Sequence, residues 1–484
     1  MGARPPYGPR VLSRREFVLS TAAVALVRAK PSPWRELARQ VRGPLVERGQ
    51  PGYAALAHGY DERWDDRLPR AILVAHGEGD VRAAVRWAAK HGVAIRARSG
   101  GHSYAGWSTV DKGLVVDLRR LRGIRLERSR TRAVIGPGAQ LGDVYAGLAR
   151  HRVTVPAGTC PSVAMGGLAL GGGMGLASRR LGLTLDRVTE VRVVTADGRV
   201  RVANAGQEED LYWACRGGGG GNFGIVTSFR LRTAPVGHAS WFSVSWPWAM
   251  ASAALAAWQE LMGGAPDALT SVLSLSTGPR VSALGQFMGP ASRLPTLIRP
   301  LTRVAGARST TGTSSYAALQ RRWAGCADIS ATACHTRGTR PGGTLPRARF
   351  AAGSDYVGRP LSAAGRAAAI AAIGRRTGGS GALLFDSYGG AINRVAPDAT
   401  AFVHRDALCS IQYLAYGPTA AGAAWVRSAR AALAAHVNGE AYQNYIDPAL
   451  AHWRRAYYGA NLARLEAVKA AVDPDRLFDF PQAV

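Results

Sequence analysis

Short stretches in the first half of the chain alternate apolar and polar positions with the period of two that a half-buried strand requires. They predict strands at residues 94–98, 114–118 and 133–136. The alternation is clearest over residues 188–202. There it runs on both sides of Asp197-Gly198, a turn pair that favours a type I′ hairpin.

One segment of the same region has a helical period instead. Apolar Val81, Ala84, Val85 and Ala88 fall on one face, which predicts a helix that Asp80 caps and that ends after His91, with Gly92 as the stop. Residues 53–70 show neither period and predict an irregular entry segment. Together these elements indicate an α+β unit over residues 50–235.

Beyond residue 236 the pattern changes to apolar strands and alanine-rich helices. Strands are predicted at residues 241–247, 382–385 and 410–416, and helices at residues 250–262, 363–375 and 420–436. We therefore expect a second domain over residues 236–439, in which helices cover a sheet. The motif-rich residues 440–484 form a separate C-terminal segment.

The composition suits a globular protein with two or three such units. The 484 residues are 47% hydrophobic and 19% charged, which argues against wholesale disorder. A formal net charge of +29 suits a polyanion partner, but four of the 61 basic residues are lysines and no five like charges form a block. The arginines indicate a GC-rich genome, and we expect no nucleic-acid partner.

The N-terminus carries a twin-arginine pattern. Ser13-Arg14-Arg15-Glu16-Phe17 precedes an apolar run over residues 17–27, which is too short to span a membrane. It predicts a signal peptide at residues 1–29, passage through the twin-arginine translocase, an extracellular or cell-envelope location and no stable membrane association. The alternative is an incidental arginine pair in an arginine-rich chain.

The five cysteines are too few for a disulfide framework in a chain of this length, and none has the spacing of a metal site. Cys326 and Cys334 are close enough to bridge after export, which the sequence leaves open. No metal is expected.

Glycines gather over residues 166–175 and 217–224. Only glycine combines positive φ with close approach of backbone amides to a pyrophosphate, so these segments favour a dinucleotide. Gly219, Gly221 and Gly224 have the Rossmann spacing, but residues 225–229 predict a strand where that motif needs a helix. The alternative is that these glycines serve tight turns alone.

Two further glycine-containing segments each hold one nucleophile. His102 lies within residues 98–104 and Cys160 within residues 156–163. An imidazole nitrogen and a thiolate sulfur are suited to attack an electron-poor isoalloxazine ring, at the 8α-methyl carbon and at ring carbon 6. A turn histidine and a buried free cysteine are the alternative, but the neighbouring glycines favour a flavin tethered twice.

Five separated blocks resemble, in order, the berberine-bridge-enzyme type of flavin-linked oxidase in the vanillyl-alcohol-oxidase superfamily. The blocks are residues 98–103, 156–175, 216–226 and 400–405, and residues 442–445 with Trp453 and Asp473-Pro474. The resemblance implies an α+β fold. A PCMH-type FAD-binding domain over residues 50–235 carries an inserted α+β substrate domain (an antiparallel sheet covered by helices), and residues 440–484 return to the FAD domain.

The resemblance also implies covalent FAD, attached through His102 and Cys160. The residues expected to bind it are Arg98, Ser99, Gly100, Gly101, His102, Ser103, Gly158, Cys160, Val163, Gly166, Gly167, Gly172, Gly175, Gly221, Asn222, Gly224, Ile225 and Val226. At the Val163 position of the family, valine leaves oxygen a path to the flavin, which favours an oxidase that forms hydrogen peroxide. An ordinary apolar loop residue is the alternative.

Oxidation of an alcohol needs a base for the O–H proton. Many relatives place a carboxylate ahead of their His-Arg block, where this chain has Asn393, which cannot act as a base. The resemblance therefore favours Tyr445, with Tyr442, Asn393 and Arg394 as helpers that would lower its pKa. Tyr445 as a packed residue is the alternative. His404, Arg405, Trp453, Asn461 and Asp473-Pro474 are interpreted as structural.

The sequence thus predicts an exported FAD-dependent oxidase. It would oxidise an alcohol or hemiacetal of an oligosaccharide or a phenolic secondary metabolite by hydride transfer to flavin, and then pass the electrons to O2. Its partners would be the small-molecule substrate and O2. The alternatives are a dehydrogenase of the same fold with another acceptor, or a basic polyanion-binding protein with a vestigial flavin fold.

Overall fold

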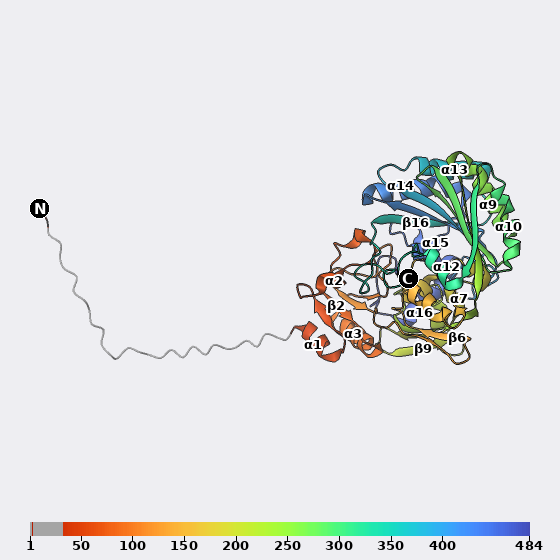
Figure 1. Ribbon diagram of the computed structural model, residues 1–484. Helices are drawn as coiled ribbons and strands as arrows, with labels where there is room; N and C mark the ends of the chain where they lie inside the picture. Colours follow the sequence, from red (N-terminus) through yellow and green to blue (C-terminus); the bar gives the residue numbers. More distant parts are fainter. Residues whose placement is uncertain (1, 3–31) are drawn as a thin grey trace.

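The computed structural model of the protein describes residue 2 and residues 32–484, so the signal peptide predicted at residues 1–29 lies outside the described range apart from Gly2. The described chain forms two lobes, each with its own hydrophobic core (Figure 1). The first lobe combines residues 32–235 with the C-terminal segment, and the second is built on one large sheet. The predicted α+β class is confirmed.

Buried apolar runs form a four-stranded sheet in the first lobe. Its strands, in order, are β1 (Leu45–Glu47), β2 (Ala71–Val74), β4 (Leu114–Asp117) and β3 (Ile95–Arg98). β2 and β4 are parallel and wholly buried, as is typical of parallel strands. Helices α1 (Pro33–Gln40) and α3 (Glu78–His91) pack on this sheet.

The start of α3 differs from the prediction. The helix begins at Glu78 with Gly77 as its N-cap, and Asp80 is buried in its first turn. The Asp80 carboxylate accepts hydrogen bonds from the backbone N–H groups of Arg42, Gly43 and His76. It therefore ties the preceding loops to the helix instead of capping it. The predicted end is confirmed, because Gly92 has φ of 62° at the C-cap.

A five-stranded antiparallel sheet follows, in the order β5 (Ile124–Leu126), β6 (Arg132–Ile135), β10 (Ile225–Arg232), β8 (Val188–Val194) and β9 (Val200–Asn204). The predicted β8–β9 hairpin is confirmed, but its type I′ turn is wrong. A type I′ turn needs positive φ at both central residues, and Gly198 has it whereas Asp197 does not. The Gly198 N–H bonds to the Thr195 carbonyl in a wider loop.

The remaining elements of the first lobe are short. They are α2 (Tyr53–Ala57), η1 (Glu62–Trp64), α4 (Leu141–Ala149), β7 (Val153–Thr154), α5 (Met165–Gly171), α6 (Ser178–Leu181), α7 (Thr184–Arg187), α8 (Glu209–Ala214) and β11 (Ala234–Pro235). Because α2 forms at residues 53–57, the predicted entry segment is only partly irregular.

The second lobe holds a seven-stranded antiparallel sheet. Its order is β15 (Arg308–Ser315), β12 (His238–Pro247), β14 (Arg280–Phe287), β13 (Leu269–Ser276), β17 (Gly381–Ser387), β18 (Cys409–Tyr416) and β16 (Phe350–Val357). Its helices are α9 (Ala251–Gly264), α10 (Leu294–Leu297), α11 (Arg299–Thr302), α12 (Tyr316–Trp323), α13 (Ala363–Gly374) and α14 (Thr419–Leu433). The strands and helices predicted in this half all form.

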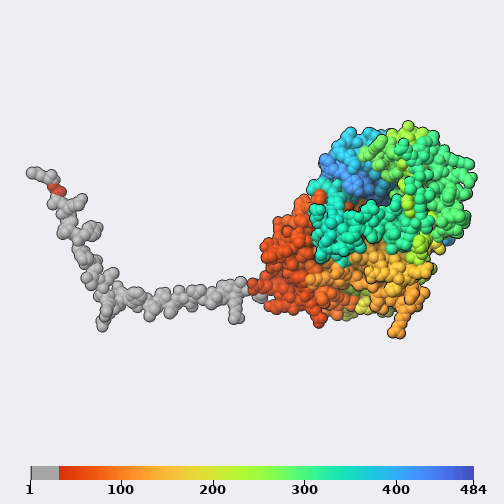
Figure 2. Space-filling model, in the orientation of Figure 1, coloured from red at the N-terminus to blue at the C-terminus, as the bar shows by residue number. Residues whose placement is uncertain are grey.

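Strand alternation gives this sheet two different faces. On β17, Leu383 and Phe385 point into the core with α9, α13 and α14. Leu384 and Asp386 point the other way and line a cavity. We call this second side the open face. It is turned toward the first lobe, which lies below the sheet lobe in the space-filling view (Figure 2).

The C-terminal segment packs into the core of the first lobe. It contains η5 (Gln443–Tyr445), α15 (Trp453–Tyr458), η6 (Gly459–Asn461) and α16 (Leu462–Val472). Leu465 and Val468 of α16 join the same core as residues of α8. The segment therefore carries η5 to the boundary between the two lobes.

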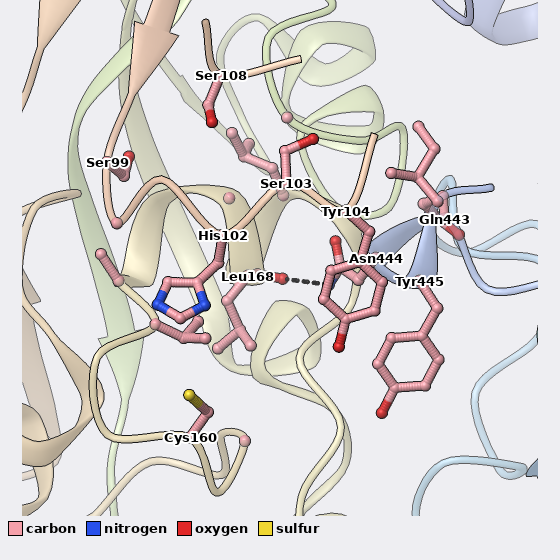
Figure 3. Close-up of a pocket in the computed structure, with 18 of the residues that line it drawn as sticks. Ser99, His102, Ser103, Tyr104, Ser108, Cys160, Leu168, Gln443, Asn444 and Tyr445 are labelled. Atoms are coloured by element: carbon pink, nitrogen blue, oxygen red, sulfur yellow. Dashed lines mark hydrogen bonds between the residues drawn. The ribbon is translucent and has the colours of Figure 1, made fainter. Parts of the chain in front are cut away.

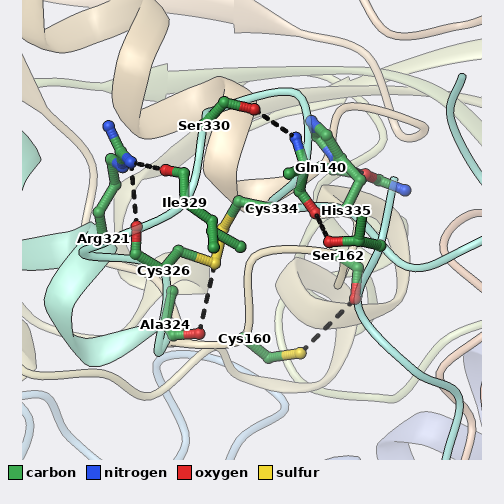
Figure 4. The surroundings of a disulfide bond; sticks show 12 residues. Gln140, Cys160, Ser162, Arg321, Ala324, Cys326, Ile329, Ser330, Cys334 and His335 are labelled. Carbon is green, nitrogen blue, oxygen red and sulfur yellow. Dashed lines mark hydrogen bonds between the residues drawn. A yellow bond between two sulfur atoms is a disulfide. The ribbon is translucent and has the colours of Figure 1, made fainter. Parts of the chain in front are cut away.

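A disulfide joins Cys326 and Cys334, with the Cα atoms 5.8 Å apart, which settles a pairing that the sequence left open (Figure 4). The segment after it docks on the first lobe, where Arg340 pairs with Asp143 of α4 at 2.6 Å. Among residues 32–484, no helix combines the length and the apolar character that a membrane span requires.

Candidate active site

A cavity of about 780 Å³ lies between the glycine-rich loops of the first lobe and the open face of the seven-stranded sheet. Its size is within the range of small-molecule sites. Its described lining contains one arginine, Arg96, and one carboxylate, Asp386, although the chain as a whole carries a net charge of +29. The cavity is therefore much less basic than the chain that surrounds it.

Along one side, Gly167 and residues 219–221 of the two glycine-rich loops line the cavity with bare backbone. A Cβ on Gly167 would have no neighbouring atom within 4 Å, and one on Gly220 would meet the Gly167 Cα at 3.5 Å. Gly219 and Gly221 have φ of 89° and 83°, which glycine adopts without strain. Backbone amides of both loops can therefore approach a pyrophosphate that lies in the cavity beside them.

His102 and Cys160 point into the same part of the cavity (Figure 3). The His102 ring stacks on Tyr60 with centroids 4.2 Å apart, and burial lowers its pKa to about 3, so the imidazole is neutral. Burial raises the pKa of the Cys160 thiol. The structure thus brings together the two nucleophiles that the sequence singled out from segments 58 residues apart.

Three buried polar atoms of lining residues have no hydrogen-bond partner in the part of the chain that the structure describes. They are Trp107 Nε1, Gln443 Oε1 and Gln482 Oε1. A buried polar group left unpaired costs about 1–3 kcal/mol, so these atoms indicate a polar ligand. The ring edge, ribityl hydroxyls and adenine of FAD offer such partners, and the bare backbone of the glycine loops suits its pyrophosphate. The residues present therefore fit FAD.

Opposite this wall, Tyr445 and Asp386 both line the cavity, close enough to influence each other's ionisation. Asp386 lies on β17 and is 7% exposed, and burial raises its pKa to about 7, while the neighbouring Tyr445 hydroxyl has a smaller, lowering effect. Burial, and then the charge of Asp386, raise the pKa of Tyr445 well above its usual range. Tyr445 is held by a parallel ring stack with Tyr104, with centroids 5.7 Å apart.

Tyr442 connects the same segment to the glycine-rich loops. Its hydroxyl accepts hydrogen bonds from the Gly173 N–H at 2.7 Å and from Asn444 Nδ2 at 2.9 Å. Asn444 also donates to the Leu168 carbonyl of α5 (Figure 3). Tyr442 and Asn444 therefore fix the position of Tyr445 relative to the loops.

Most residues predicted to bind the cofactor line the cavity. They are Ser99, Gly100, Gly101, His102, Ser103, Gly158, Cys160, Val163, Gly166, Gly167, Gly175, Gly221, Asn222, Gly224 and Val226. Three do not. Arg98 forms a buried ion pair with Asp117 at 3.0 Å, Gly172 is covered by the Tyr442 ring, and Ile225 packs in the core beside the four-stranded sheet.

Of the three predicted helpers of Tyr445, Tyr442 lies in the cavity lining beside it, but Asn393 and Arg394 are placed elsewhere. Asn393 Oδ1 accepts from the Gly389 N–H and its Nδ2 donates to the Ala407 carbonyl, so this amide holds a loop. Arg394 is exposed and pairs with Asp267. Neither lines the cavity, and the pKa of Tyr445 is raised where assistance would have lowered it.

The carboxylate that sequence reasoning missed is Asp386. The family resemblance placed a carboxylate at the position that Asn393 occupies, several residues further along the chain. The available signal was the alternation over residues 381–387, which places Asp386 on the same side of β17 as Leu384, opposite Leu383 and Phe385. An aspartate at an alternating position in a strand whose other face is core is a candidate for a site.

Two family profiles match the chain. The profile described as "FAD binding domain" covers residues 69–204, and the one described as "Berberine and berberine like" covers residues 441–484. An uncharacterized FAD-linked oxidoreductase of Bacillus subtilis, YgaK, is 33% identical over 92% of this chain and 97% of its own length. The chain belongs to the berberine-bridge-enzyme-like FAD-linked oxidoreductases.

Two further relatives span most of this oxidoreductase. A chitooligosaccharide oxidase of Gibberella zeae is 32% identical and covers 86% of this chain and 87% of its own. The solved structure of Physcomitrella patens BBE-like 1 superposes with a TM-score of 0.88 at 30% identity, over 93% of this chain and 98% of that one. FAD is therefore the cofactor of this oxidoreductase, and both lobes belong to the family fold.

Proposed function

We propose that the protein is an oxidase that holds FAD through two covalent bonds, to His102 and Cys160, and oxidises an alcohol or hemiacetal carbon. One observation carries the proposal. A neutral imidazole and a thiol converge on one wall of the cavity, and the phenol of Tyr445 and the carboxyl group of Asp386 line the same cavity on the other side. The bound FAD supplies hydride acceptance at the ring.

The protein then has to remove the hydroxyl proton. Asp386 with a pKa of about 7 is largely ionised above neutral pH, whereas the Tyr445 phenol stays protonated. The pair therefore acts as one base. Tyr445 passes its proton to the Asp386 carboxylate while it accepts the proton of the substrate hydroxyl. Burial keeps Asp386 basic enough for this role, since an exposed aspartate has a pKa of about 4.

The lining favours a neutral substrate with apolar faces. Tyr104, Phe350 and Tyr416 form an aromatic wall, and Leu284, Leu384 and Leu414 line the open face. Ser274, Ser282 and Gln412 add hydrogen-bonding groups. A sugar ring or a phenolic ring could stack on this wall, and the chitooligosaccharide oxidase of Gibberella zeae is a relative that acts on oligosaccharides.

Oxygen as the acceptor is supported by Val163, a lining residue three positions beyond Cys160. The rival is a dehydrogenase that uses another acceptor. Export is supported by the twin-arginine pattern at Arg14-Arg15 and by the Cys326–Cys334 disulfide, because disulfides persist in oxidising compartments.

The test joins two measurements on the purified yellow protein. Acid precipitation should leave the flavin in the pellet, and the single variants His102→Ala and Cys160→Ala should each keep one bond. Oligosaccharides and phenolic alcohols are then screened for anaerobic bleaching of the flavin and, in air, for peroxide release. Flavin that leaves the wild type completely in acid would refute the covalent attachment. Bleaching without peroxide would favour the dehydrogenase.

A further inference from the structure

Ser162 lies between the two nucleophiles. Its Oγ is 3.0 Å from His102 Nε2 and 3.7 Å from Cys160 Sγ. The residue is 1% exposed, and no other group in the described chain bonds to this hydroxyl. Figure 4 shows the contact between Cys160 and Ser162 beside the disulfide segment.

The loop that carries Ser162 is fixed by backbone bonds on both sides. Leu141 N–H donates to the Val163 carbonyl at 2.9 Å, and Gly142 N–H donates to the Pro161 carbonyl at 3.0 Å. A Cβ on Gly100 would come within 3.1 Å of the Ser162 carbonyl, so the His102 segment lies close against this loop. The hydroxyl therefore has a defined position relative to both nucleophiles.

The sulfur of Cys160 lies beside hydrogen-bond donors. The backbone N–H groups of Ser162 and Val163 and the Ser162 hydroxyl all favour its charged form. No cationic side chain of the described chain contributes to this effect. The hydroxyl is thus the one side-chain group among residues 32–484 that stabilises a thiolate at this position.

The direction of the hydrogen bonds follows from what each group can donate. A neutral imidazole donates from one ring nitrogen and accepts at the other. If the Ser162 hydroxyl donates its hydrogen bond to the sulfur, its oxygen must accept the hydrogen bond from His102 Nε2–H. The lone pair of His102 then resides on Nδ1, which is free to attack.

We propose that Ser162 is a positioning residue for both covalent attachments: by accepting from His102 Nε2–H and donating to Cys160 Sγ, one hydroxyl makes Nδ1 the nucleophilic nitrogen and stabilises the thiolate. The inference rests on the covalent attachment proposed above. It assigns to Ser162 a role in assembling the holoenzyme, separate from substrate oxidation.

Both attachments balance with dioxygen as the oxidant. For sulfur, the S–H and a ring C–H bond break and an S–C bond forms. The ring takes up two electrons and both protons, and O2 then removes them as H2O2. For histidine, a methyl C–H bond breaks and a C–N bond forms at Nδ1. The Nε2 proton leaves through the Ser162 hydroxyl and the methyl proton leaves to solvent. The electron pair again passes from the ring to O2, which takes up two protons and leaves as H2O2.

The decisive variants are Ser162→Thr and Ser162→Val, because they have the same shape and differ in the hydroxyl. Protein made under riboflavin limitation is given FAD in air, and attachment at His102 and at Cys160 is followed separately by peptide mass mapping between pH 6 and 9. Ser271→Ala is the matched control. This serine is also buried and its hydroxyl is hydrogen-bonded, but it lies in the second lobe.

We expect Ser162→Thr to attach FAD at both sites, and Ser162→Val to bind FAD but attach it about 10- to 100-fold more slowly at both. That range corresponds to the loss of one hydrogen bond to a charged group. Attachment at Cys160 in the valine variant should recover as the pH rises, because the thiol then ionises unaided. Ser271→Ala should attach FAD at the wild-type rate.

Equal rates for threonine and valine would overturn the proposal, and so would a defect confined to one of the two residues. If neither variant accumulates, the same mapping on Ser162→Ala and Ser162→Cys decides between a role of the hydroxyl and one of packing. Wild-type protein that attaches no FAD would refute the proposed covalent function itself. If the wild type and the Ser162→Val variant both attach FAD at the same rate, this inference alone is refuted.

Discussion

Asp386 sets the pH range of the proposed reaction. Its carboxyl group is deprotonated only as the pH rises through about 7, so the reductive half-reaction should accelerate from pH 6 to 8 and then level off. The same raised pKa affects stability with the opposite sign. Between about pH 4 and 7 the folded protein keeps a proton that the unfolded chain has lost, so stability falls as the pH rises through this window.

The first prediction separates these effects with Asp386→Asn. The amide cannot accept the proton, so anaerobic flavin reduction should slow by about 10²–10⁴-fold and lose its rise through pH 7. Because no carboxylate remains to be buried, the melting temperature at pH 8 should equal or exceed that of the wild type. Tyr445→Phe should lower the rate similarly, with unchanged flavin content. Wild-type rates in both variants would reassign the base.

Val163 carries the second prediction. Leucine at this position adds one methylene beside the flavin site and should obstruct oxygen, with a stability loss of up to about 1–3 kcal/mol from overpacking. Val163→Leu should therefore be reduced by substrate at the wild-type rate and reoxidised more slowly in air, while an artificial dye still accepts the electrons. Both half-reactions use the same cavity, so a change in one alone isolates the path of oxygen. Unchanged reoxidation would mean that Val163 serves packing alone.

At the scale of residues, sequence patterns brought most of the predicted cofactor-binding residues to one cavity, because glycine, histidine and cysteine carry their chemistry locally. They failed where tertiary contacts decide the role. Arg98 lies inside a motif but satisfies a buried carboxylate, Asp117. Asp386 lies outside every motif. It comes near Tyr445 only because of the position that β17 occupies in the seven-stranded sheet.

Single elements show the same division. The apolar periods predicted the helices and strands, since burial of one face is a property of each element by itself. The start of α3 and the β8–β9 turn were missed because partners outside the element decided them. Asp80 is held by the N–H groups of Arg42 and Gly43, and the hairpin turn is widened by a bond to Thr195.

The disulfide segment gives a third prediction, at the scale of an element. Cys326–Cys334 closes a short loop whose following residues dock beside α4, where the His335 ring is hydrogen-bonded to Gln140. Replacing both cysteines with alanine should destabilise the protein by about 2–3 kcal/mol, as expected for a loop of this length. Melting and flavin content are measured together. Full stability without the bridge would show that the docking contacts hold the segment alone.

The whole molecule brings its site together from three parts of the chain. Contacts between distant segments fix the lobes, including the buried ion pair of Arg405 with Asp186 at 2.7 Å and the hydrogen bond between the His404 ring and Glu440 at 3.0 Å. Arg405 and His404 were expected to be structural, and both lie away from the cavity lining. The fold class could be predicted from the order of elements and motifs. The distance between the two lobes depends on such contacts between distant segments, and local sequence patterns do not predict these contacts.

The proposed export signal gives a prediction at the scale of the whole molecule. Replacing Arg14 and Arg15 with lysine keeps the charge but removes the guanidinium pair, so flavin-containing protein should remain in the cytoplasm. The same double substitution at Arg454 and Arg455, an adjacent arginine pair far from the N-terminus, is the matched control and should leave export unchanged. Cell fractions are assayed by flavin fluorescence. Secretion of the Arg14/Arg15 variant at the wild-type level would remove the signal assignment.

The two faces of the seven-stranded sheet separate the residues that line the cavity from the residues that form the core. Val272, Ser274, Ser282, Leu284 and Leu384 contact the cavity, while their strand neighbours Leu273, Leu275, Val281, Ala283 and Leu383 contact the core. The cavity-facing positions are therefore free to change together without disturbing the helix layer or the glycine loops. A combinatorial library confined to those five positions would therefore change the substrates that the enzyme accepts and leave the flavin chemistry unchanged. Natural substitutions at the same positions would diversify substrate use within the family in the same way.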